Sequence, residues 1–315
     1  MYNIQIYKTC SSNSSTSTSK EDISLVSYEE YIIKFTNHET NQEQHLKIHI
    51  DKDFNEKQIQ NLIQSLLEES NTTIIDLMCN EINDLYICSN KNNNKKYGGN
   101  RNDGYEKLTQ DVKGAGFYNS KNEQIVLYSK GDKIDIDVLT HELGHAKDSG
   151  SYNSRYLFQL LSSEKAGLND RYFLVSPEEF YAEFFKDYAI VQAHIEKQLN
   201  KNYGEILNKM PESHRQKFIQ EVAIMKITGE NETVSSILER AGLEQYKNLF
   251  NEDIDKKIDA SLPNSGNNYE LISHLSLIYK CSKKNSEIRK EFNKFIRDIS
   301  NEYNSPKKAK KLMGV

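Results

Sequence analysis

One short stretch constrains this chain more than any other: residues 139–145 read LTHELGH, which contains the pattern H-E-x-x-H. His141 and His145 are four residues apart, so on a helix both imidazoles project from one face and can reach one Zn²⁺. Glu142 lies between them, where its carboxylate can take a proton from water on the metal. These groups are typical of metal-assisted hydrolysis of a peptide bond. The alternative is a helix that carries two His and a Glu on a half-exposed face without a metal.

The residues around this motif predict a helix that packs on a core. Its apolar face has members three and four residues apart, at Ile136, Leu139 and Leu143. Asp135 or Asp137 can cap the first turn, because a carboxylate there accepts a backbone N–H. Gly150 can adopt the left-handed conformation that commonly ends a helix. The two His therefore project from a well-defined helix, away from its apolar face.

The composition bounds the class of protein. With 315 residues and 37% hydrophobic content, the chain can bury the core of one large domain or of two to three small ones. No run of about 18 apolar residues is present, so no transmembrane helix is predicted. Residues 1–20 lack the apolar centre of a signal peptide. Export would need another route, or a signal peptide has been removed from this sequence.

Charge and cysteine usage exclude further classes. The net charge of -5 comes from mixed Lys and Glu, which does not favour nucleic acid as a partner. The basic run at residues 307–311 is either a solvated tail or a segment that docks on an acidic surface. The four cysteines are Cys10, Cys79, Cys88 and Cys281, and no two of them form a C-x-x-C pair. We therefore expect free thiols rather than a zinc ribbon or a disulfide framework.

The N-terminal third has the patterns of a small α/β lobe. Strands are predicted at residues 1–9, 28–36, 44–50, 72–77 and 84–88, with the second and third forming a hairpin. Residues 54–69 have the apolar period of a helix. The polar runs at 11–19 and 90–104 indicate loops, and the second is either a boundary between lobes or a mobile flap.

Three histidines in this lobe raise the question of a second metal site: His38, His45 and His49. On a strand, His45 and His49 lie on one face but roughly 13 Å apart, too far for one ion. We therefore expect surface histidines here.

A second hairpin is predicted directly before the motif helix, from the glycines at 114 and 116 to the apolar run at 124–128. An exposed strand edge beside a metal helix can pair with an extended peptide through backbone hydrogen bonds. The segment is either such a substrate edge or an ordinary hairpin.

The C-terminal third has mostly helical periods. Helices are predicted at residues 203–210, 214–228, 233–241, 269–281 and 286–303. Residues 241–250 are similar to the opening of a SAM-type interaction domain, but a plain helical bundle is the favoured interpretation.

Two His do not complete a catalytic zinc site, which usually has three protein ligands. Glu179 and Glu183 lie one turn apart on a second predicted helix and supply candidate carboxylates. Ser176 and Glu179 also fit a capping box, with Pro177 at the first helical position. Spacing alone leaves both roles of Glu179 open.

The two motifs together resemble the anthrax lethal factor family of zinc metallopeptidases, to which Pro-Pro endopeptidases also belong. The resemblance covers residues 114–188 and consists of H-E-x-G-H-A-x-D, then E-[FY]-[FY]-A-E-x-F, with a tyrosine seven residues ahead of the latter. The matching residues are His141, Glu142, Gly144, His145, Ala146, Asp148, Tyr172, Glu179, Phe180, Tyr181, Ala182, Glu183 and Phe185.

The resemblance implies a role for each site residue. The zinc ligands, for one Zn²⁺ per chain, would be His141, His145 and Glu179. Glu142 would be the general base, and Tyr172 would donate a hydrogen bond to the oxyanion of the tetrahedral intermediate. Glu183 would orient a His ligand through its free N–H.

We accordingly expect an α+β fold of zincin-like type, with a small mixed sheet, the motif helix and a helical C-terminal region. The expected parts are an N-terminal lobe at 1–104, a catalytic core at 105–195 and a helical region at 196–315. The implied function is a zinc metalloendopeptidase, a toxin or effector that acts on host proteins and binds its substrate as an extended strand. It would be secreted or delivered into a host cell, or otherwise remain in the cytoplasm. The rival interpretation is a zincin-fold regulatory or binding protein that acts on one cytoplasmic partner.

Overall fold

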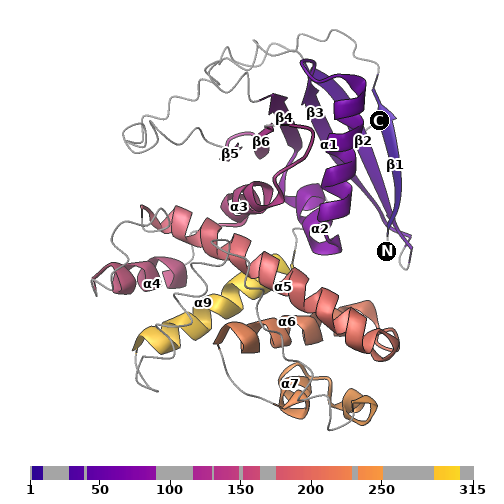
Figure 1. Cartoon of the computed structure of the whole chain (residues 1–315). Coiled ribbons are helices and arrows are strands. Elements are labelled where there is room, and N and C mark those ends of the chain that lie inside the picture. The colour runs from indigo at the N-terminus through magenta and orange to yellow at the C-terminus, as the bar shows by residue number, and fades with distance from the viewer. Residues whose placement is uncertain are drawn as a thin grey trace. The chain divides into compact units, whose positions relative to one another are not determined.

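The computed structural model describes residues 2–9, 28–38, 41–89, 116–129, 131–148, 152–163, 175–228, 233–250 and 287–305. A six-stranded mixed sheet and its helices come first, and a helical region follows, so the predicted α+β class is confirmed (Figure 1). The chain forms two compact units, one up to residue 147 and one from residue 148 to 305. The boundaries expected at residues 104 and 195 stay predictions.

The sheet belongs to the first unit and has the order β1-β2-β3-β4-β6-β5. Its strands are β1 (Tyr2–Lys8), β2 (Tyr28–Asn37), β3 (Glu43–Asp51), β4 (Asp84–Ser89), β5 (Gly116–Asn119) and β6 (Gln124–Ser129). β1, β2 and β3 are antiparallel, β4 runs parallel to both β3 and β6, and β5 returns antiparallel to β6. Both predicted hairpins are therefore confirmed.

One face of the sheet carries the core of this unit. Alternate strand residues have no exposed surface, among them Ile33, Phe35, Ile48, Ile50, Leu85 and Ile87. Helix α1 (Glu56–Glu69) buries the apolar face that its period predicts, and Asn55 and Gln58 begin it with a reciprocal capping box. The predicted helix at 54–69 is confirmed.

The strand predicted at residues 72–77 is wrong, because these residues begin helix α2 (Thr72–Glu81). Asn71 caps the helix, and its side-chain oxygen accepts the N–H of Ile74 at 2.9 Å. Ile74, Leu77 and Met78 are then buried together, because positions three and four apart share one helix face. Burial and the cap outweigh the β-propensity of the Thr-Thr-Ile-Ile run.

Helix α3 (Ile136–Lys147) follows β6 and carries the H-E-x-x-H motif. Asp135 caps it, since its carboxylate accepts the N–H groups of Asp137 and Val138, both at 3.2 Å. Leu139 and Leu143 have no exposed surface, as the predicted apolar face requires. The predicted helix is confirmed, while Gly150 lies outside the described residues.

The second unit consists of helices. They are α4 (Tyr152–Ser163), α5 (Pro177–Leu207), α6 (Glu212–Thr228), α7 (Val234–Arg240), the 3₁₀ helix η5 (Glu244–Leu249) and α9 (Glu287–Tyr303). An aromatic core joins α5 to α9, with the Phe184 and Phe295 ring centroids 4.6 Å apart.

The helices predicted at 214–228, 233–241 and 286–303 are confirmed. Of the segment predicted at 203–210, the part up to Leu207 is the end of α5, which is kinked at Tyr203. Residues 241–250 contain η5, and the segment at 269–281 lies outside the described residues.

No helix in the described ranges is long and apolar enough to cross a membrane. Cys79 and Cys88 are free thiols, as expected from their spacing.

Candidate metal centre

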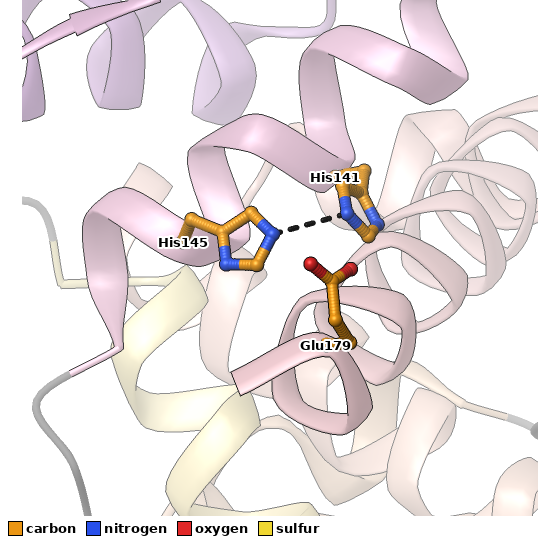
Figure 2. A group of neighbouring side chains, drawn as sticks. All are labelled: His141, His145 and Glu179. Atoms are coloured by element: carbon orange, nitrogen blue, oxygen red, sulfur yellow. Dashed lines mark hydrogen bonds between the residues drawn. The ribbon is translucent and has the colours of Figure 1, made fainter. Parts of the chain in front are cut away.

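Helix α3 brings the two motif histidines together through its own geometry. The Nε2 atoms of His141 and His145 lie 3.1 Å apart, with the rings at 82° to each other (Figure 2). Two nitrogens that bind one tetrahedral zinc at about 2.05 Å would be about 3.3 Å apart. The spacing of the two nitrogens therefore fits a shared metal ion. His141 is buried and His145 is half-buried.

Glu179 lies in the first turn of α5, where Ser176 is the cap and Pro177 the first helical residue. The Ser176 hydroxyl oxygen accepts the backbone N–H of Glu179 at 3.2 Å. The Glu179 carboxylate forms a group with His141 and His145, whose ligand atoms all lie within 4.8 Å of one another (Figure 2). Ser176 therefore caps α5 through the backbone N–H of Glu179, and the Glu179 side chain belongs to the group with the two histidines.

The donor set of this group fits zinc. Two imidazole nitrogens and one carboxylate oxygen are a known ligand set of catalytic zinc sites, which keep a further position for water. Among the described residues, no other group of three His, Cys, Asp or Glu side chains comes together in this way. The group can hold one metal ion, and such a site suggests a metallohydrolase.

Glu142 is buried on α3 next to His141, with 6% of its surface exposed. Thr140, on the other side of His141, is also buried, and its hydroxyl donates to the Ile136 carbonyl at 2.7 Å. The part of α3 that carries the motif is therefore enclosed, which limits the conformations of its side chains.

The roles of the remaining two predicted site residues, Glu183 and Tyr172, stay predictions. Glu183 is half-buried one turn beyond Glu179, and Lys186 donates to its Oε2 at 2.5 Å. Its expected role in orienting a His ligand stays a prediction. Tyr172 lies outside the described residues.

Gly116 is a residue whose role the sequence did not specify. A Cβ added to it would lie 2.9 Å from Val138 Cγ1 of α3 and 3.0 Å from the Val126 carbonyl oxygen. The missing side chain therefore lets β5 pack closely against the motif helix. A glycine inside a strand is the available signal for such a close approach.

The three histidines of the N-terminal lobe do not form a metal site. His38 and His45 are exposed, as expected. His49 was expected on the surface but is half-buried. Its Nε2 lies 2.8 Å from Asp84 Oδ1, and its ring stacks on Tyr86 with the ring centroids 4.3 Å apart.

Comparison with known proteins found no family model, no curated protein and no solved structure that matches this chain. The functional interpretation therefore depends on the chemistry of the site.

Proposed function

We propose that this chain is a zinc-dependent metalloendopeptidase. The observation that carries the proposal is the group of His141, His145 and Glu179, whose ligand atoms lie within 4.8 Å of one another. These residues would hold the ion. When bound, zinc supplies a Lewis acid that acidifies water and polarises the carbonyl of the scissile bond.

The chain's own residues would supply the proton transfers. Glu142 takes a proton from the attacking water at its carboxylate and delivers it to the departing amine nitrogen. Tyr172 donates a hydrogen bond from its hydroxyl to the carbonyl oxygen as negative charge develops there. Glu183 orients an imidazole ligand, which keeps the ligating nitrogen deprotonated.

The substrate would bind as an extended peptide along β5. In the described part of the sheet, β5 pairs with β6 and is an edge strand, so one row of its backbone groups does not belong to the sheet ladder. An extended chain can pair with such an edge regardless of its side chains. Because Gly116 allows β5 to approach α3, the edge lies beside the motif helix.

The resemblance to the anthrax lethal factor family supports the catalytic interpretation over a binding protein. Glu142 and Tyr172 stand at the positions that the family uses for chemistry, and a protein that only binds a partner needs neither. By this resemblance the chain would be a toxin or effector that acts on host proteins, secreted or delivered into the host cell. The second candidate, a zincin-fold regulator of one cytoplasmic partner, would bind without cleaving.

The proposal is tested by incubating the purified protein with a peptide library, with and without a metal chelator. We expect cleavage that the chelator abolishes and that added zinc restores. The test variant is Glu179→Gln, which removes the charge of the third ligand. It should weaken both zinc binding and cleavage. Cleavage that persists in the chelator would contradict the proposal. Zinc binding without cleavage of any peptide would favour the regulatory candidate.

A further inference from the structure

The last turn of α3 carries a buried ion pair outside the catalytic residues. Lys147 Nζ lies 3.0 Å from Glu81 Oε1, and the two side chains are 7% and 0% exposed. Glu81 is the last residue of α2, so the pair joins the C-terminal ends of two helices in the same compact unit. Charges withdrawn from water are strongly destabilising unless they stay together. The pair therefore restricts the relative movement of the two helix ends.

The position of this pair on α3 matters for His145. The first turn of α3 is held by the Asp135 cap, and its middle by Leu139 and Leu143, which are fully buried. His145 lies beyond these contacts, in the last turn, where helices fray. Lys147 is two residues further on and holds this turn against α2. A lysine there is also favoured by the partial negative charge of the helix C-terminus.

We propose that Glu81 and Lys147 are positioning residues that set the metal affinity of the histidine pair. By fixing the last turn of α3, the ion pair holds the His145 imidazole at the spacing from His141 that one ion requires. This inference rests on the proposed zinc function. The competing explanation is that the pair only stabilises the packing of α2 on α3.

The decisive variant is the double substitution E81Q/K147M. It removes both charges, so no lone charge is left buried. Circular dichroism and urea unfolding check that the variant is folded before zinc is measured. Zinc affinity is measured by competition with a chromophoric chelator, and the geometry of the site by the visible absorption of the Co²⁺ form. We expect zinc affinity to fall by about 10- to 100-fold, as for other residues that orient metal ligands, with altered cobalt bands. Lys147→Arg keeps the charge and should stay within about threefold of wild type.

Arg240→Met is the matched control, because Arg240 also forms a largely buried ion pair, with Glu221 of α6 in the other unit. It should lower thermal stability and leave zinc affinity unchanged. If E81Q/K147M binds zinc within about threefold of wild type and its cobalt spectrum is unchanged, the positioning role is wrong, since the expected loss is at least tenfold. Wild-type protein that binds neither zinc nor cobalt would instead overturn the zinc site itself, and this inference with it.

Discussion

His141 and Glu142 are adjacent and both buried, at 8% and 6% exposure, yet the proposed chemistry gives them different tasks. In that proposal, His141 would bind the metal, whereas Glu142 would transfer protons. We therefore expect Glu142→Ala to retain about one zinc per chain and to lower the cleavage rate by about 10²-fold or more. Metal analysis and a peptide cleavage assay on the same sample separate the two effects. Loss of zinc in this variant would show that Glu142 has been assigned the wrong task.

Tyr172 separates the proposed family from other H-E-x-x-H proteins. If its hydroxyl stabilises the oxyanion, Tyr172→Phe should lower kcat by about 10² to 10³, with zinc content and KM little changed. The matched control is Tyr246→Phe, which removes a hydroxyl that lies 2.9 Å from His214 in the helical unit. A kcat of Tyr172→Phe within about threefold of wild type would indicate a packing residue and weaken the family assignment.

Asp84 allows a test of the sheet by pH. Burial raises its pKa, but hydrogen bonds with His49 and Gln124 outweigh burial and hold the pKa below its ordinary value. A carboxyl with a lowered folded-state pKa contributes stability above its unfolded pKa, near 3.9, and this contribution is lost as the pH falls through the folded value. Asp84→Asn should therefore lower the free energy of unfolding by about 1.5 to 3 kcal/mol at neutral pH. Urea titrations should show a smaller loss below about pH 4; an equal loss at both pH values would contradict the ionic role.

At the scale of elements, the close packing of β5 on α3 can be tested through Gly116. Its added Cβ would meet the Val126 carbonyl oxygen at 3.0 Å, and a backbone atom cannot move aside cheaply. Gly116→Ala should destabilise the protein by about 1 to 3 kcal/mol. If β5 binds the substrate as proposed, the variant should also raise KM, because the added Cβ pushes β5 away from the motif helix. The control is Gly204→Ala in α5, where an added Cβ meets nothing within 4 Å and alanine favours the helix. Wild-type stability and KM in Gly116→Ala would remove the support for β5 as the substrate edge.

Elements with local signals could be predicted from the sequence, and those decided by distant contacts could not. Helix α3 has its cap and its apolar period within a dozen residues, so the local sequence was enough to predict this helix. Helix α2 was mistaken for a strand because Ile74 and Ile75 favour strands locally, whereas their burial in the folded unit decides the outcome. The hydrogen bond of His49 with Asp84 and the Glu81–Lys147 pair join segments far apart in the sequence, which leave no local pattern. The sequence named Glu179 as a candidate ligand, but only the fold shows its carboxylate beside His141 and His145.

At the scale of the whole molecule, bound zinc should stabilise the folded chain, because the unfolded chain has no assembled site. At free zinc about 100 times Kd, the gain is about 2.7 kcal/mol, which calorimetry would detect as a higher unfolding temperature. Glu142→Ala should show the same gain, since it keeps every ligand, whereas His141→Ala should show little. The gain should also decrease in acid, because protons compete with the metal for the imidazoles. An unfolding temperature that does not respond to zinc would contradict a structured metal site.

Every turn of α3 carries a residue with a structural or proposed functional role, and this limits how the sequence of the helix can change during evolution. The cap at Asp135, the buried leucines, the histidine pair and the ion pair at Lys147 follow one another along a single helix. Each residue turns the helix by about 100°, so one inserted or deleted residue would rotate everything beyond it away from its partners. Residues 135–147 can therefore diverge by substitution but not by a change of length. A search for distant relatives should permit no gap across these positions, even where little else of the sequence remains.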